Sequence, residues 1–169
     1  MKVLETDRLI LRFMNTNDAP FILKLLNDES WLRFIGDKGV KTIEDAENYI
    51  LTGPMEMYER LGFGLYIVEL KENSTPVGMC GLIKRITLED IDIGFALLSE
   101  YQSNGYAYEA ALATLAHGSQ QLGLERIVAI TTVDNSTSSA LLKKLGMTHE
   151  RNIVLPHQDE ELKYYSIEF

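Results

Sequence analysis

Cysteine is nearly absent from this chain of 169 residues: Cys80 is the only one, and it lies between Met79 and Gly81 in an apolar segment. A single cysteine excludes an intramolecular disulfide and is compatible with a reducing compartment such as the cytoplasm. No run of about 18 apolar residues occurs, and the first residues lack the apolar core of a signal peptide. We therefore expect a cytoplasmic protein without a membrane segment.

Basic residues are scarce as well, since 16 lysines and arginines stand against 25 aspartates and glutamates, a formal net charge of −9. Nucleic-acid binding relies on a basic surface that displaces phosphate counterions, so we expect no nucleic acid as partner. An acidic surface instead favours a cationic partner such as an amine. The three histidines show no metal-ligand spacing, and we expect no metal site.

Two catalytic motifs are missing. The Gly-x-Ser-x-Gly of serine hydrolases does not occur, and neither does the Gly-x-Gly-x-x-Gly of Rossmann dinucleotide enzymes. What the chain does have is 46% hydrophobic and 24% charged residues, without repeats or linkers. This composition predicts one globular domain, residues 1 to 169, with a hydrophobic core of its own.

The pattern of apolar and turn residues predicts an α/β fold. Strands are expected at residues 4–14, 65–70, 77–85, 91–98, 126–133, 147–155 and 163–169. Helices are expected after Asp18, at 42–50, at 55–61, from the 102–107 segment to Gly123, and after Asn135, while Trp31 to Gly39 is expected to be a loop. This order gives a mixed sheet with helices on both faces, and residues 91 to 133 form one right-handed parallel crossover.

The segment from 91 to 146 holds the strongest functional signal. Tyr108, Leu112, Leu115, Ser119 and Leu122 recur at intervals of three or four, which predicts one apolar stripe on a helix. At its start, small residues allow a ligand to approach the backbone. The first N–H groups of a helix have no helical partner and lie at the positive end of its dipole, so they bind phosphate readily.

Three segments together carry a family resemblance. Residues 102–107 resemble the Gln/Arg-x-x-Gly-x-Gly/Ala signature of the GCN5-related N-acetyltransferases (GNAT), and residues 135–147 resemble the second signature of that family. Residues 5–12 resemble the first strand of the branch that acetylates the N-termini of ribosomal proteins. The resemblance implies acetyl-CoA as co-substrate and a mostly antiparallel mixed sheet with a central splayed parallel strand pair.

The resemblance also assigns roles in cofactor binding. It implies that the backbones of Leu97 and Leu98 pair with the pantetheine amides, and that the Leu98 N–H faces the thioester oxygen. The diphosphate is expected on the N–H groups of the signature loop, namely Gln102, Ser103, Asn104, Gly105, Tyr106 and Ala107. Read without the resemblance, this loop is only a turn between strand and helix.

The resemblance of the second signature implies that Asn135 holds the pantetheine arm of the cofactor. It also implies that Ser138 lies near the sulfur and is a candidate general acid. Both residue types are also ordinary helix caps. For Asn135, capping is compatible with cofactor binding, whereas for Ser138 capping competes with the role of general acid. Lys143 and Lys144 are candidates for the ribose 3′-phosphate. Lysines at this position more often complement a helix C-terminus, the interpretation that we prefer.

Asp92 is the carboxylate that we choose as general base, where related sequences carry glutamate. Its shorter side chain suggests a bridging water. The alternative is a solvent-facing strand residue between inward-pointing Ile91 and Ile93. Glu100 is a weaker candidate.

The predicted function is acetyl transfer from acetyl-CoA to a primary amine by direct transfer in a ternary complex. The acceptor is open among a protein N-terminus, antibiotic amines, polyamines and amino acids, and a homodimer is compatible with the sequence. The alternative function is a non-catalytic acyl-CoA-binding sensor or regulatory module.

Overall fold

The computed structural model describes all residues from 1 to 169 and contains one sheet of eight strands in the order β1-β2-β3-β4-β5-β6-β8-β7. The strands are β1 (Lys2–Glu5), β2 (Leu9–Arg12), β3 (Leu65–Leu70), β4 (Pro76–Ile83), β5 (Asp92–Leu97), β6 (Arg126–Thr132), β7 (Thr148–Ile153) and β8 (Leu162–Glu168). The helices are α1 (Ala19–Leu26), α2 (Glu29–Phe34), α3 (Ile43–Thr52), α4 (Pro54–Leu61), α5 (Tyr106–Gln120) and α6 (Ser136–Lys144).

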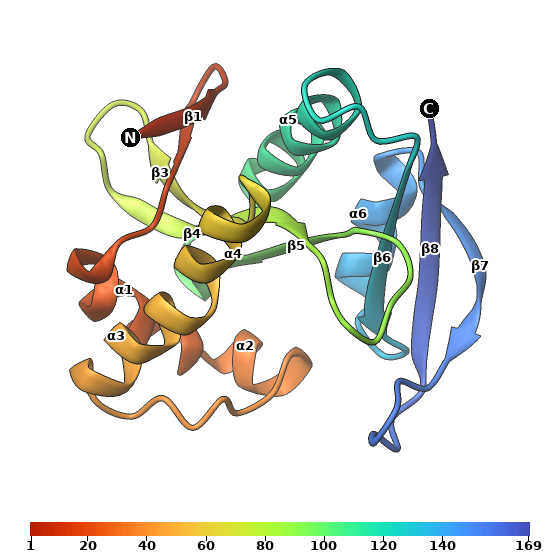
Figure 1. Cartoon of the computed structure of the whole chain (residues 1–169), viewed down its shortest axis with the longest axis horizontal. Helices are drawn as coiled ribbons and strands as arrows, with labels where there is room; N and C mark the ends of the chain where they lie inside the picture. The colour runs from red at the N-terminus through yellow and green to blue at the C-terminus, as the bar shows by residue number, and fades with distance from the viewer.

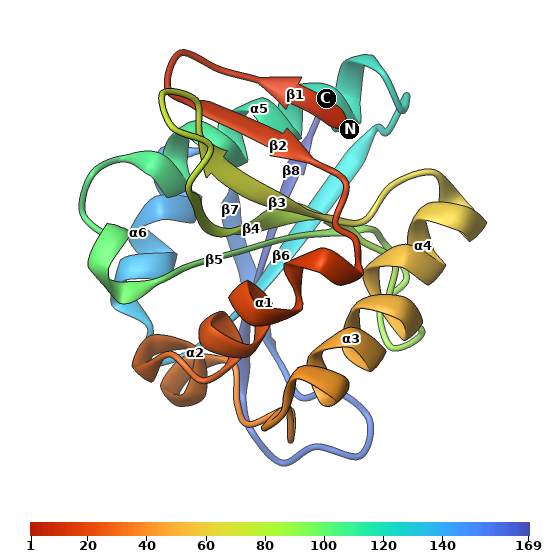
Figure 2. The same cartoon turned by 90° about the vertical axis from the view of Figure 1, so that its left-hand side faces the viewer.

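Helices cover both faces of this sheet. Alternate strand residues belong to two separate cores: Tyr66 and Cys80 pack with α5 and α6, whereas Ile67 and Met79 pack with α1 and α3. Figure 2 shows α1 to α4 along one side of the sheet and α5 and α6 on the other. The predicted fold class is therefore confirmed.

All neighbouring strands pair antiparallel except β5 and β6, which are parallel. β5 pairs with β4 from Gly78↔Leu97 to Ile83↔Asp92, but its only register pair with β6 is Asp92↔Val128. Beyond that point the two strands diverge, and Figure 1 shows β5 crossing the molecule while β6 and β8 run nearly upright. The divergence leaves one edge of β5 without a strand partner, as the resemblance implied.

Helix α5 lies on the sheet through small side chains. Its buried residues are Ala110, Ala111, Thr114, Leu115 and Gly118. A Cβ at Gly118 would lie 2.8 Å from Ile127 Cδ1, so the helix sits too close to the sheet for a larger side chain. The predicted stripe is wrong at Leu112, which is 46% exposed, because small residues rather than large ones set the buried face.

Two other predictions need correction. In place of one strand at 4–14, the structure has the antiparallel pair β1 and β2, with a turn in which Thr6 N donates to Leu9 O at 2.9 Å. Trp31 lies in helix α2 rather than in a loop, because Asp28 caps its start by accepting from Ser30 N at 3.0 Å. Both elements are short, and tertiary contacts decide them: Glu109 accepts from Arg8 N at 2.9 Å.

The start of α3 follows the sequence closely. Asp45 N donates to Thr42 Oγ1 at 3.0 Å and Asp45 accepts from Thr42 N at 3.2 Å, which is the predicted capping box. Pro54 begins α4 at a position that needs no helical N–H. No helix in the chain combines the length and the apolarity that crossing a bilayer would require.

Candidate active site

A cavity of about 790 Å³ opens where β5 and β6 diverge and extends toward α2 and α3. It brings together most of the predicted site residues, namely Asp92, Leu97, Gln102, Ser103, Gly105, Tyr106, Ala107, Asn135 and Ser138. Leu98, Asn104 and Lys143 are predicted residues that do not line it. One part of the cavity lies between α5 and α6 and the other between β4, β5, α2 and α3. From the roles that the resemblance implies, we call the first the cofactor half and the second the acceptor half.

The turn before α5, called the anion-binding turn for its expected role, exposes backbone N–H groups without a partner in the chain. Ser103 and Gly105 have φ values of +66° and +82°, and no side chain caps the helix. None of the N–H groups of residues 103–108 is donated to another atom of the protein, whereas Gln102 N donates to Ser99 O at 3.3 Å. The available donors thus begin at Ser103, one residue later than predicted.

Arg8 braces this turn and was missed from the sequence. Its Nη1 donates to Asn104 O at 2.9 Å, its guanidinium lies 4.6 Å from the Tyr106 ring centre, and Nε pairs with Glu109 at 2.7 Å. Asn104 itself is structural, because its Nδ2 donates to Tyr101 O and Gln102 O. The family-like segment at residues 5–12 was the only sequence signal for Arg8, and it gave no role.

The free edge of β5 is defined by hydrogen-bond alternation. Leu98 N donates to Val77 O at 2.9 Å, so this amide belongs to the pairing with β4. The expectation that the Leu98 N–H faces a thioester is therefore wrong. Because antiparallel pairing alternates along a strand, Leu97 and Phe95 direct their N–H groups toward β6 and the cavity. Gln102 Nε2 donates to Leu97 O at 3.2 Å and fixes the end of this edge.

The start of α6 carries the second signature. Asn135 Oδ1 accepts from Ser138 N at 3.1 Å, which confirms Asn135 as the helix cap. Ser138 is half-buried and lines the cavity. At the other end of the helix, Lys144 rather than Lys143 lines the cavity, with Nζ 4.2 Å from the Tyr108 ring centre. Of the two candidates for the 3′-phosphate, only Lys144 therefore borders the cavity.

Asp92 is a buried carboxylate with a cationic partner. It is only 1% exposed, and Arg85 Nε lies 3.0 Å from its Oδ1. The alternative of a solvent-facing strand residue is therefore wrong. Burial raises the pKa of Asp92, and the charge and hydrogen bond of Arg85 oppose that shift. A carboxylate with a raised pKa is a stronger base than a solvated one, which suits proton abstraction.

Neither the weaker candidate Glu100 nor the single cysteine lies in the cavity. Glu100 is exposed outside the cavity and pairs with Lys24 at 2.9 Å. Cys80 is fully buried against Thr114, and burial raises the pKa of its thiol to about 12. Such a thiol stays protonated at neutral pH and is no nucleophile.

The acceptor half contains three residues, Lys38, Tyr49 and Arg85, that sequence reasoning did not connect with the site. Trp31, Lys38, Tyr49 and Arg85 all line the cavity. Burial raises the pKa of Tyr49 to about 12, so its hydroxyl remains a hydrogen-bond donor at neutral pH. These residues come from α2, the loop after it, α3 and the loop after β4, and no spacing in the sequence links them.

Comparisons with known proteins agree with this geometry. Residues 8–148 match the family model of the acetyltransferase (GNAT) domain. The chain is 32% identical to YoaA of Bacillus subtilis, an uncharacterized N-acetyltransferase, over 88% of this chain and 84% of the relative. It superposes on a GNAT-family acetyltransferase from Bacillus anthracis with a TM-score of 0.81 at 27% identity, over 99% of this chain and 98% of the other.

A further structural neighbour is RimL, a ribosomal alpha-N-protein acetyltransferase, in complex with coenzyme A. The TM-score is 0.84 at 18% identity, over 100% of this chain and 98% of RimL, which shows that the two share a fold. The family uses acetyl-CoA, and the cavity, the anion-binding turn and the free β5 edge of this chain suit that co-substrate. The chain belongs to the GNAT acetyltransferase family and is an acetyl-CoA-dependent N-acetyltransferase.

Proposed function

We propose that the protein transfers the acetyl group directly to a primary amine while co-substrate and acceptor occupy the two halves of the cavity together. The supporting observation is that one continuous cavity is lined both by residues with free N–H groups, namely Ser103 and 105–108, and by the buried Asp92. Strands rise about 3.3 Å per residue, so Asp92 and Leu97 are about 16 Å apart along β5. That length suits an extended arm lying along the free edge.

Each part of the cofactor half has a binding role in this proposal. The N–H groups of residues 103–108 hold the diphosphate, the β5 edge at Phe95 and Leu97 aligns the pantetheine amides, and Asn135 borders the arm. Acetyl-CoA supplies an activated acyl carbon as a thioester. Holding two reactants in the reactive orientation lowers the activation free energy by about 7–11 kcal/mol, so orientation contributes the larger part of catalysis in this proposal.

Asp92 and Ser138 handle protons in this proposal. A bond forms between the amine nitrogen and the acyl carbon, the carbon–sulfur bond breaks, and the electron pair leaves with sulfur. Asp92, directly or through one water, accepts the proton that the amine loses. The Ser138 hydroxyl donates a hydrogen bond to the departing sulfur. A single base of this kind typically contributes roughly 10²–10⁴-fold.

The acceptor is an amine of a protein N-terminus or of a small molecule, encountered in the cytoplasm. RimL acts on a ribosomal protein and shares this fold, which supports the first class. The experiment has two parts: calorimetric titration of the purified protein with coenzyme A, then measurement of thiol release from acetyl-CoA with a panel of peptides and amines. Absence of coenzyme A binding by the folded protein would overturn the proposal. Binding without thiol release on any acceptor would identify a sensor module instead.

A further inference from the structure

The acceptor half of the cavity has a charge pattern opposite to that of the whole protein. The chain has a formal net charge of −9. Within the cavity, however, Arg85 pairs with one carboxylate, Asp92, and a second cation, Lys38, lines the wall. Lys144 lies by Tyr108 in the cofactor half, and Glu160 borders the cavity from the loop between β7 and β8. Distant surface charge is screened over about 8 Å at physiological salt, so the local groups decide which acceptor binds.

Arg85 has unused hydrogen-bonding capacity. Its Nε donates to Asp92, but neither terminal nitrogen of its guanidinium donates to any atom of the chain. A planar guanidinium offers a fork of parallel donors that matches a carboxylate. Arg85 is also only 37% exposed, so an anion that reaches this fork is partly withdrawn from water.

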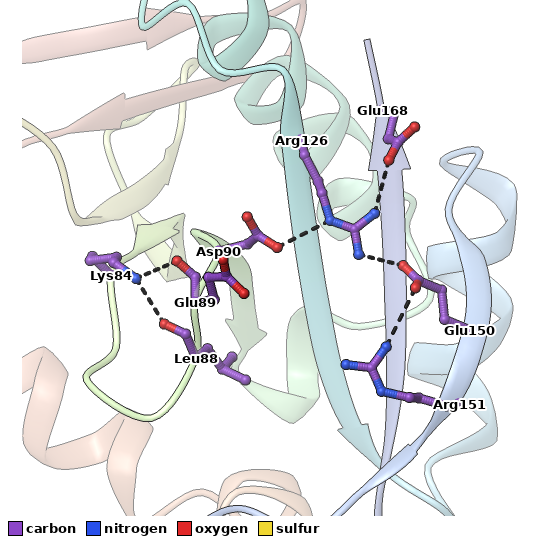
Figure 3. A network of polar contacts seen from close by, with 8 residues as sticks. All are labelled: Lys84, Leu88, Glu89, Asp90, Arg126, Glu150, Arg151 and Glu168. Carbon is purple, nitrogen blue, oxygen red and sulfur yellow. Dashed lines mark hydrogen bonds and ion pairs between the residues drawn. The ribbon is translucent and has the colours of Figure 1, made fainter.

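The loop that carries Arg85 is held in place from both sides. Lys84 Nζ donates to Leu88 O at 2.8 Å and to Glu89 O at 2.5 Å. Asp90 pairs with Arg126 at 3.1 Å, and Arg126 also pairs with Glu150 at 2.6 Å (Figure 3). These contacts attach the loop to β6 and β7, so the position of Arg85 is set before any ligand binds.

Lys38 is a cation without an anionic partner. It forms no ion pair, whereas its neighbour Lys41 pairs with Asp37 at 3.2 Å. Desolvation, and then the positive charge of Arg85, lower the pKa of Lys38, and no carboxylate opposes them. Arg85 is also the charged group that acts on the buried Tyr49 hydroxyl. Two cations thus line the same cavity, an exposed Lys38 and a half-buried Arg85.

We infer that the acceptor amine carries a carboxylate near its nitrogen, and that Arg85 and Lys38 bind this carboxylate while Asp92 faces the amine. This inference rests on the proposed acetyl transfer. A carboxylate relieves the repulsion between the two cations and fills the free fork of Arg85. A polycationic acceptor would bring further positive charge to the same place. The carboxylate belongs either to a free α-amino acid or to an acidic residue at a peptide N-terminus.

The test compares matched acceptors at equal concentrations of neutral amine. One pair is a peptide amide that begins with aspartate and the same peptide beginning with asparagine, and the other pair is leucine and leucinamide. We expect the carboxylate member of at least one pair to have a kcat/KM about tenfold higher, since hydrogen bonds to charged groups are strong. The pair that shows the preference identifies the source of the carboxylate. Equal or better turnover of both neutral members would overturn the inference and leave acetyl transfer intact.

Variants assign the preference to the cationic pair. Lys38→Gln should raise KM for the preferred acceptor by roughly 5- to 30-fold and so reduce its advantage over the neutral acceptor. Lys41→Gln lies in the same loop outside the cavity and serves as the matched control. A preference that survives Lys38→Gln would refute the assignment.

A binding measurement separates this inference from the proposed function. The acetylated products of both pairs are titrated into the protein with coenzyme A present, which requires no turnover: the α-amides of N-acetylaspartate and N-acetylasparagine, and N-acetylleucine with N-acetylleucinamide. We expect the carboxylate product of at least one pair to bind more tightly and to lose that advantage in Lys38→Gln. Equal affinities within both pairs would contradict the carboxylate site even if no amine is acetylated.

Discussion

Replacing Asp92 by asparagine tests the proposed base with almost no change of shape. The carboxylate is 1% exposed, and asparagine keeps an oxygen that can accept from Arg85 Nε. If Asp92 accepts the proton, the variant should lose roughly 10²–10⁴-fold in kcat, the usual contribution of one general base. Coenzyme A binding should be unchanged, because the phosphate-binding turn lies at the far end of β5.

The same substitution has a predictable effect on stability. Burial raises the pKa of Asp92 in the folded protein, so the folded state binds more protons than the unfolded state between the two pKa values. The free energy of unfolding contributed by Asp92 therefore falls as pH rises from the unfolded pKa, about 3.9, through the raised folded pKa. A tenfold difference in proton affinity between the two states corresponds to about 1.4 kcal/mol. Asp92→Asn should remove this dependence and be no less stable than the wild type at pH 7.

The assay pairs pH–rate profiles with urea unfolding of both proteins from pH 4 to pH 8. The difference between the two unfolding curves isolates Asp92 from the many carboxylates whose pKa values are lowered. Turnover of the variant at the wild-type rate across this range would refute Asp92 as the base. A variant that grows less stable relative to the wild type as pH rises would refute the argument from burial.

Three further predictions concern the turn, the end of α6 and the ion-pair network. Gly105→Ala should weaken coenzyme A binding about tenfold or more in calorimetry, since φ is +82° and the new Cβ would lie 3.2 Å from an Arg8 nitrogen. Gly123→Ala, at φ +69° with open space around it, imposes similar backbone strain and should bind normally. Lys144→Gln should weaken coenzyme A severalfold but leave dephospho-coenzyme A unaffected, whereas Lys143→Gln should change neither; equal losses for both ligands would exclude a 3′-phosphate contact. Arg126→Met should lower the melting midpoint by roughly 2–4 °C at pH 7 by leaving three carboxylates together. That loss should shrink as pH falls, because hydrogen bonds from Ser166 and Arg126 lower the pKa of Glu150 in the wild type. A decrease in the melting midpoint that does not depend on pH would contradict the electrostatic cause.

Local features of the site could be predicted from the sequence. The turn at Gly105, the cap at Asn135 and the capping box at Thr42 depend on residues a few positions apart, and the structure has them where they were expected. The alternation of β5 also follows from the sequence. The sequence did not reveal which edge of β5 faces the cavity, because that depends on which strand pairs with the other edge. The Leu98 N–H donates to Val77 O of β4, so the Leu97 N–H points the other way and remains free.

The sequence by itself determined the family, the turn before α5 and the order of elements apart from the β1–β2 pair and α2, because each of these depends on short-range spacing. Only the tertiary structure decided that β5 and β6 part after Asp92, that Lys144 rather than Lys143 faces the cavity, and that Arg85 pairs with Asp92. Lys38, Tyr49 and Arg85 come from three separate segments, and nothing in their spacing relates them. They meet because two cores pack on opposite faces of one twisted sheet, and the charge of the acceptor half follows from that packing.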